Sequence, residues 1–160
     1  MSVAFTKEES AETAAETLLP DRPVPEGPNL VTAAGLAGLE RRLAEARAAY
    51  DATMAIEDIN EKRRQAAAPF RDLRYFAERV RTAQVVPPPD TNDVVAFGSR
   101  VTVSRDDGRV HTYMIVGEDE ADPKAGTLSF SSPLARALMG KGVDDTASVA
   151  GGEVEIVRIE

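Results

Sequence analysis

The sequence predicts an α+β protein in which an antiparallel helical hairpin is followed by a small β-rich domain. Apolar residues recur every three or four positions over residues 30–83, which is the period of an amphipathic helix. After residue 92 the pattern changes to short β-branched runs separated by turn residues. The 160 residues therefore divide into a flexible tail (1–29), a coiled-coil hairpin (30–83), a Pro-rich linker (84–92) and a C-terminal domain (93–160).

The tail is expected to be disordered or loosely docked, because four prolines between positions 20 and 28 disfavour a helix.

Composition excludes several classes of protein. The absence of cysteine excludes a disulfide framework, a thiol nucleophile and cysteine-based metal sites. The single histidine, His111, excludes a multi-histidine metal site. No apolar run approaches the length of a membrane span, and the N-terminus lacks the pattern of a secretory signal. We expect a cytoplasmic monomer that contacts no membrane.

The net formal charge of −8 conceals a basic middle third. Residues 30–83 hold ten basic and eight acidic side chains, whereas both flanking segments are acidic. The charge of the hairpin is therefore a better guide to partners than the charge of the whole chain.

Two apolar seams predict the two arms of the hairpin, with Thr32 as the N-cap of the first helix. The first seam consists of Leu36, Leu39, Leu43, Ala46 and Tyr50, and the second of Ile59, Lys62 or Arg63, Ala66, Phe70, Leu73, Phe76, Val80 and Ala83. Arms of equal length place the turn at residues 54–60, and each arm is then about 23 residues or roughly 35 Å long. Pro69 is expected to kink the second helix rather than end it.

The C-terminal domain is expected to contain about five strands and one short helix. Strand-like runs occupy residues 94–97, 101–103, 110–116, 127–131 and 154–159. An Asp107-Gly108 pair indicates a turn between the second and third runs. Ser132 and Pro133 start a short helix over 134–139, and Gly140 follows its end.

Four blocks of this domain closely resemble the C-terminal domain of the bacterial Gre transcript-cleavage factors, GreA and GreB. In order they are VAFGS (95–99), IVGEDEAD (115–122), SPLARALMGK (132–141) and GGEV (151–154). Residues 30–36 and 81–86 are more weakly similar to the start and end of that family's coiled-coil hairpin.

The resemblance implies an FKBP-like fold for the C-terminal domain and bacterial RNA polymerase as the partner. In this family the domain docks at the polymerase secondary channel, the coiled coil reaches toward the active centre, and two tip acids help to hold a second Mg²⁺. The polymerase itself cleaves backtracked RNA. The chain is therefore expected not to be an enzyme and to hold no intrinsic cofactor, the relevant metal being the Mg²⁺ of the polymerase. The 3′ end of the nascent RNA is a further candidate contact.

The predicted tip departs from the family motif, which reads Asp, two residues, Glu, Asn. Here Asp51 is followed by Met54 at the glutamate position. The acids at the expected turn are Glu57 and Asp58, our first candidates for the tip, with Glu61 and Asp51 as weaker ones. The same two acids also suit capping of the second helix. The hairpin is about fourteen residues shorter than that of the family, which removes about 10 Å of reach.

Two further sets of residues are candidate contacts with the polymerase. Arg63 and Arg64 form a basic hairpin face for RNA or channel acids, with a plain solvated face as the alternative. The expected docking residues of the C-terminal domain are Asp119, Glu120, Asp122, Ser132, Pro133, Leu134 and Arg136.

Three functions stay open on this basis. The first is an elongation regulator that binds the polymerase and, if its tip reaches the active centre, stimulates cleavage of backtracked RNA. The second is a non-cleaving factor that occupies the secondary channel and inhibits or competes. The remote third is an unrelated binding module or isomerase on an FKBP-like fold, which eight aromatic residues and no tryptophan disfavour.

Overall fold

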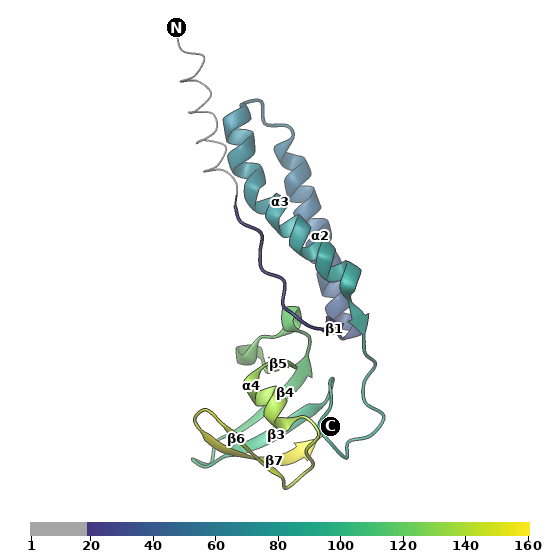
Figure 1. Ribbon diagram of the computed structural model, residues 1–160, viewed down its shortest axis with the longest axis vertical. Helices are drawn as coiled ribbons and strands as arrows, with labels where there is room; N and C mark the ends of the chain where they lie inside the picture. The colour runs from purple at the N-terminus through teal and green to yellow at the C-terminus, as the bar shows by residue number, and fades with distance from the viewer. Residues whose placement is uncertain (1–18) are drawn as a thin grey trace. The chain divides into compact units, whose positions relative to one another are not determined.

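The computed structural model describes residues 19–160, in which the chain forms two units (Figure 1). The hairpin unit contains the described residues up to Glu26 together with Leu39–Arg81. The β unit contains Gly27–Gly38 and Thr82–Glu160. The expected tail therefore lies partly outside the described residues, because these begin at Leu19. Within 19–160, no helix has the length and apolar character needed to cross a membrane.

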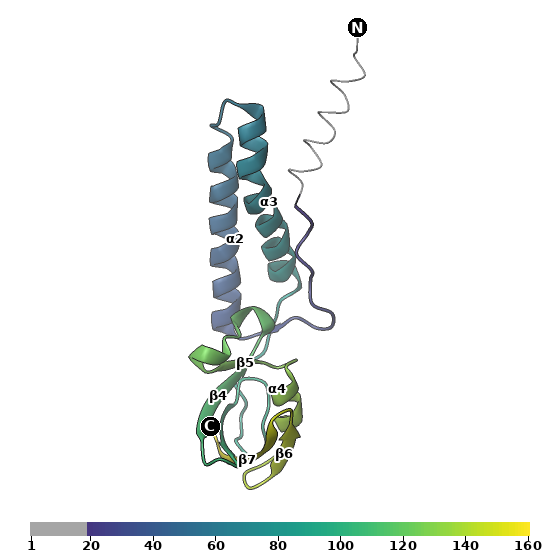
Figure 2. The same ribbon diagram turned by 90° about the vertical axis from the view of Figure 1, so that its left-hand side faces the viewer.

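Two helices, α2 (Ala33–Thr53) and α3 (Ile59–Thr82), form the arms of the hairpin and lie side by side (Figures 1 and 2). The break between them falls within the segment 54–60 predicted for the turn. Leu39, Ala46 and Thr53 of α2 are buried and lie seven residues apart, as a heptad seam requires. The ring of Tyr50 lies 5.6 Å from that of Phe70 across the two arms. The helix α3 continues through Pro69.

The second seam begins later than predicted. Ile59 is 62 % exposed, because it is the first residue of α3 and directly follows the turn. The side chain of Phe70 is also partly exposed, at 42 %. Phe76, by contrast, is buried, with 8 % exposed. The assignment of Ile59 to the hairpin core was therefore wrong, and burial in α3 is concentrated toward its C-terminal half.

Within the described chain, five strands form the sheet of the β unit in the order β5-β4-β3-β7-β6. The strands are β3 (Arg100–Arg105), β4 (Val110–Val116), β5 (Thr127–Ser129), β6 (Thr146–Val149) and β7 (Gly152–Ile159). Neighbours are antiparallel except β4 and β5, which are parallel. The predicted turn after β3 is confirmed, with Gly108 at a φ of 83° that favours glycine.

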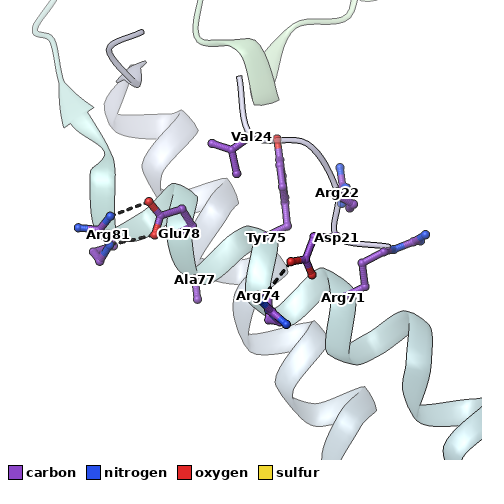
Figure 3. Close-up of a pocket in the computed structure, with 9 residues that line it drawn as sticks. All are labelled: Asp21, Arg22, Val24, Arg71, Arg74, Tyr75, Ala77, Glu78 and Arg81. Carbon is purple, nitrogen blue, oxygen red and sulfur yellow. Dashed lines mark hydrogen bonds and ion pairs between the residues drawn. The ribbon is translucent and has the colours of Figure 1, made fainter. Parts of the chain in front are cut away.

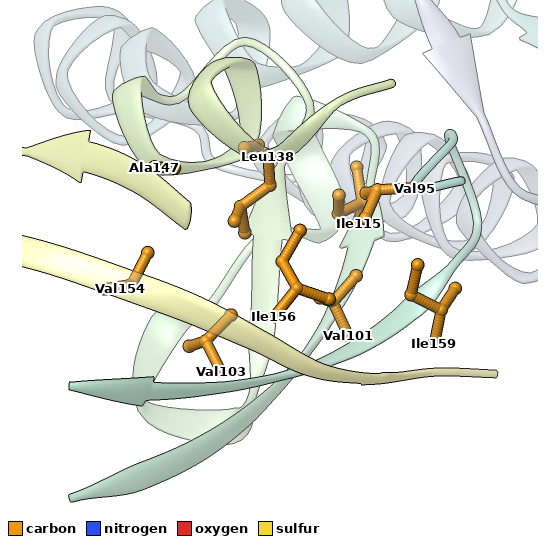
Figure 4. Packing of buried hydrophobic residues seen from close by; sticks show 10 residues of the cluster. Val95, Val101, Val103, Ile115, Leu138, Ala147, Val154, Ile156 and Ile159 are labelled. Carbon is orange, nitrogen blue, oxygen red and sulfur yellow. The ribbon is translucent and has the colours of Figure 1, made fainter. Parts of the chain in front are cut away.

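One face of this sheet packs against the short helix α4 (Pro133–Leu138), as Figure 4 shows. Alternate residues of β3 and β7 point into the core, among them Val101, Val103 and Ile156, and none of these three is exposed. Leu138 of α4 is equally buried. Ser132 caps α4 and Gly140 follows it at a φ of 80°, which confirms the predicted helix to within one residue.

Two strand predictions in this unit were wrong. Residues 94–97 form no strand, and Val95 enters the core from a loop. The Val95 N–H donates to the Lys141 carbonyl, and the Val95 carbonyl accepts from the Gly140 N–H, each at 2.8 Å. The β6 strand was not predicted at all. Its sequence, Thr-Ala-Ser-Val, has only one strongly apolar residue, and it becomes a strand by pairing with β7 at the sheet edge.

The Pro-rich linker begins as a strand. β2 (Gln84–Val85) pairs in parallel with β1 (Leu30–Val31), which immediately precedes α2. The Gln84 N–H donates to the Asn29 carbonyl at 2.8 Å, and the Val86 N–H donates to the Val31 carbonyl at 2.9 Å. These bonds join the chain entering the hairpin to the chain leaving it.

Candidate functional site

The turn of the hairpin is organised by Asp58, which caps α3. Its carboxylate accepts a hydrogen bond from the Glu61 N–H at 2.8 Å, and its carbonyl accepts one from the Lys62 N–H at 2.9 Å. An aspartate at this position satisfies one of the free donors at the start of a helix. The structure therefore gives Asp58 the capping role, which occupies one of its two carboxylate oxygens.

Glu61 is engaged on both oxygens. One accepts from the guanidinium of Arg64, with Nε at 3.2 Å, and the other accepts from the Gln65 amide at 2.7 Å. The Arg64 hydrogen bonds are the main reason that the pKa of Glu61 lies below its ordinary value, with a smaller contribution from Gln65. The same pair raises the pKa of Arg64. Glu61 and Arg64 therefore bind each other.

Glu57 and Asp51 remain accessible near the turn. Both side chains are exposed, and neither carboxylate has a hydrogen-bond or ion-pair partner among residues 19–160. No cluster of three or more acidic or histidine side chains suited to a metal ion is present in that range. The hairpin turn thus offers isolated carboxylates, which could complete a metal site supplied mainly by another molecule.

The basic hairpin face splits into paired and unpaired cations. Arg64 is committed to Glu61, whereas Arg63 is exposed and has no partner within the described chain. Lys62 is half-buried and likewise lacks an ion-pair partner among residues 19–160. Of the two arginines expected to act together, only Arg63 is free to meet an anion.

An N-terminal strap, residues 19–26, lies against α3 and forms one wall of a groove of about 460 Å³ (Figure 3). Asp21 pairs with Arg74 at 3.1 Å, and Arg22 pairs with Asp72 at 3.3 Å. The Arg22 guanidinium also lies 4.0 Å from the centre of the Tyr75 ring. Such a cation–π contact holds an extended segment that has no core of its own. Residues 19–26 of the expected tail therefore contact α3 of the hairpin unit.

Glu120, an expected docking residue, instead makes an internal contact. It lies in the short helix η1 (Glu118–Glu120), and its carboxylate accepts from the Thr32 N–H at 3.2 Å and from the Thr32 hydroxyl. The Gly117 N–H donates to the same carboxylate at 3.3 Å. Thr32 itself caps α2, as predicted, by accepting from the Gly35 N–H at 2.9 Å. Glu120 thereby connects η1 to the start of α2 within the β unit.

The other expected docking residues divide between structural and accessible roles. Asp122 caps the short helix η2 (Pro123–Ala125), and Ser132 caps α4. Leu134 packs against the core cluster, and Asp119 is half-buried in η1. Pro133 and Arg136 are exposed on α4. The hydroxyl of Ser131 donates to Glu118 at 2.6 Å and so joins the segment before α4 to the acidic loop.

Sequence reasoning missed two glycines that permit close packing beside η1. A Cβ on Gly35 would overlap the Glu120 carboxyl group, and a Cβ on Gly117 would overlap the Leu30 carbonyl oxygen. A glycine inside a helical pattern costs about 1 kcal/mol relative to alanine, so its presence signals a packing reason. The strap contacts of Asp21 and Arg22, in contrast, have no signal in the sequence.

Comparison with known proteins identifies relatives of the chain. Residues 90–160 match the family described as transcription elongation factor, GreA/GreB, C-terminal. The transcription elongation factor GreA of Chelativorans sp. is 36% identical over 140 residues, which cover 84% of this chain and 83% of that protein. GreA of Sphingopyxis alaskensis is 41% identical over 90 residues, which cover 56% of this chain and 55% of the relative. The crystal structure of GreA factor homolog 1 (Gfh1) of Thermus thermophilus aligns with 84% of this chain and 99% of its own, at 22% identity and a TM-score of 0.39.

Proposed function

Because this chain belongs to the GreA/GreB family of transcription elongation factors, we propose that it regulates elongation by binding bacterial RNA polymerase, with its β unit at the secondary channel and its hairpin inserted. The observation that carries this proposal is the similarity to GreA over 140 residues, which is long enough to include hairpin and β unit together. Any RNA cleavage would then be performed by the polymerase.

The geometry of the turn favours occupancy of the channel as the principal activity. Both Glu61 oxygens are engaged within the protein, and Asp58 uses one oxygen as a helix cap. A carboxylate that leaves such contacts to bind a metal gives up those hydrogen bonds. Insertion of the hairpin requires no such loss, so it can regulate elongation without a metal-binding tip.

Stimulation of RNA cleavage is the second candidate, and the exposed Glu57 favours it. Carboxylate oxygens suit Mg²⁺, and Glu57 together with the remaining oxygen of Asp58 would be the residues that meet a Mg²⁺ held by the polymerase. Such an ion would stabilise the charge that develops on the scissile phosphate. Two adjacent carboxylates do not hold Mg²⁺ alone, which agrees with a donated rather than a resident site.

The experiment compares the full chain with GreA on stalled, backtracked polymerase. We expect this chain to bind the polymerase, to displace GreA and to lower GreA-stimulated cleavage, with little cleavage of its own. The Glu57→Gln variant and the Asp58→Asn variant, which keeps a capping side chain, should compete equally well. Absence of polymerase binding would overturn the proposal as a whole.

Strong cleavage by the wild type would instead establish the second candidate. In that case Glu57→Gln should remove cleavage and leave polymerase binding intact. Cleavage that survives both Glu57→Gln and Asp58→Asn would exclude these two residues and direct attention to Asp51.

A further inference from the structure

The groove between the strap and α3 is built from two segments that lie far apart in the sequence (Figure 3). The strap contributes Asp21, Arg22 and Val24 to its lining, and α3 contributes the other residues. All of them belong to the hairpin unit. The groove has a volume of about 460 Å³, which is within the range of sites that hold a small organic molecule.

The lining of this groove carries more cations than anions. Its guanidinium groups belong to Arg22, Arg71, Arg74 and Arg81, and its carboxylates to Asp21 and Glu78. Four cations and two anions give the lining a formal charge of +2. Two of the arginines are paired within the groove, Arg74 with Asp21 at 3.1 Å and Arg81 with Glu78 at 2.6 Å. The surplus positive charge therefore resides on Arg22 and Arg71 and favours an anion, most strongly a dianion.

Arg71 is the least engaged of these arginines. Its Nε atom is buried and has no hydrogen-bond partner within residues 19–160. The Asp72 Oδ1 atom lies 3.9 Å away, beyond hydrogen-bond distance, and accepts instead from Arg22 at 3.3 Å. The Arg71 side chain is 33% exposed, so an anion in the groove can reach its guanidinium group. Binding an anion there breaks no hydrogen bond of Arg71 within the described chain.

The remaining part of the lining is apolar. Val24 is 44% exposed and lines the groove from the strap, and Ala77 lines it from α3. The Arg22 guanidinium lies 4.0 Å from the centre of the Tyr75 ring, a contact that holds it in the wall. A ligand that suits this groove therefore combines an oxyanion with an apolar body.

We infer that this groove binds a small organic phosphate monoester, whose phosphate group pairs with Arg71 and Arg22. The organic group of the ligand lies against Val24 and Ala77. A phosphate monoester carries a charge of about −1.5 to −2 at pH 7, which matches the charge of the lining, whereas a carboxylate carries half of it. Planar guanidinium groups also suit phosphate oxygens, because they donate two parallel hydrogen bonds. Binding at this site does not depend on the polymerase.

Phenyl phosphate is the probe for this site, and NMR titration of the full chain at constant ionic strength measures its binding. We expect saturable binding with a Kd of about 1 mM. Inorganic phosphate lacks the apolar body and should bind more weakly. Benzoate keeps the ring but carries a single charge, so it should also bind more weakly than phenyl phosphate.

Two substitutions in α3 should change the affinity in opposite directions. Arg71→Gln removes the principal cation and should weaken binding by about tenfold. Glu78→Gln removes a negative charge from the lining and releases Arg81, so it should tighten binding by about threefold. The matched control is Arg41→Gln, at an exposed arginine of α2 outside the lining, which should leave the affinity unchanged.

The contribution of the strap is tested separately. Arg22→Ala should weaken binding of phenyl phosphate about as much as Arg71→Gln does, because both guanidinium groups meet the phosphate. An unchanged affinity in Arg22→Ala would overturn the assignment of the site to the groove between strap and α3.

Three other results would overturn the inference. The first is an equal affinity of the wild type and Arg71→Gln, and the second is weaker binding after Glu78→Gln. The third is the absence of saturable binding of phenyl phosphate. If a single-stranded RNA oligonucleotide then bound through Arg71, the groove would be part of a surface for nucleic acid rather than a site for a small phosphate ester.

Discussion

The Glu120 carboxylate accepts a hydrogen bond from the backbone N–H of Thr32, a residue 88 positions earlier in the chain. Both residues belong to the β unit: the acceptor lies in η1, and the donor directly precedes α2. A carboxylate at a helix N-terminus both satisfies free N–H groups and complements the helix dipole. The contact therefore gives Glu120 a structural role, in which it connects η1 to the start of α2.

The Glu120–Thr32 contact predicts that the effect of Gly35→Ala on stability changes sign when Glu120 is removed. Glu120→Ala should lower the free energy of unfolding by about 1.5–3 kcal/mol, because a charged hydrogen-bonding group is lost. Gly35→Ala should destabilise the wild type, since the new Cβ displaces the Glu120 carboxylate. In the Glu120→Ala background the same change should stabilise by up to about 1 kcal/mol, the ordinary helix preference of alanine. Urea denaturation of the four proteins measures this double-mutant cycle. Additive effects of the two substitutions would contradict the close contact between Glu120 and the start of α2.

The capping role of Asp58 predicts different effects of two substitutions. Asp58→Ala should destabilise the protein by about 0.5–2 kcal/mol, whereas Asp58→Asn retains a capping oxygen and should change little. Glu57→Ala, at an exposed neighbour with no partner among residues 19–160, is the control and should stay within about 0.5 kcal/mol of wild type. Equal losses for alanine and asparagine in thermal unfolding would show that Asp58 does not act as the cap.

Glu61 should titrate below its ordinary pKa of 4.5, because Arg64 and Gln65 donate to its ionised form. A pKa lowered by folding stabilises the protein above the unfolded value, and this contribution disappears as the pH falls through the folded pKa. Arg64→Ala should therefore raise the pKa of Glu61 toward 4.5 and reduce this contribution to stability, while the hydrogen bond from Gln65 remains. Side-chain NMR titration of both proteins follows the change, and an unchanged Glu61 pKa in the variant would contradict the assignment.

The strap should contribute measurably to the hairpin through Arg22. Arg22→Ala should cost about 0.5–2 kcal/mol, because it removes a cation–π contact with Tyr75 and an ion pair with Asp72. Arg22→Lys keeps the charge but not the planar group, so its loss should be smaller. The matched control is Arg41→Ala, whose exposed pair with Glu45 spans 4.0 Å and should contribute almost nothing. Chemical denaturation that ranks Arg41→Ala above Arg22→Ala would contradict the strap contact.

The architecture was predictable where the signal repeats along the chain. The heptad spacing of Leu39, Ala46 and their neighbours predicted the first arm, and equal arm lengths predicted the turn between Thr53 and Ile59. The residues Ser132, Pro133 and Gly140 predicted the short helix in the same way, because their preferences operate within one turn. The candidate site was less predictable. Among the four acids of the turn, only the folded structure distinguishes the cap Asp58 and the paired Glu61 from the accessible Glu57.

The elements whose causes are local can be read from the residue pattern: two amphipathic helices, a turn between them, and alternating strands such as β7. Other features depend on neighbours that are distant in the sequence: β6 becomes a strand by pairing with β7, and Val95 enters the core from a loop instead of forming a strand. The tertiary structure also decided that Glu120 meets Thr32 and that Arg22 meets Tyr75. The physical reason is that hydrogen bonds and stacking between distant residues depend on how the backbone brings them together, and no periodicity in the chain records that encounter.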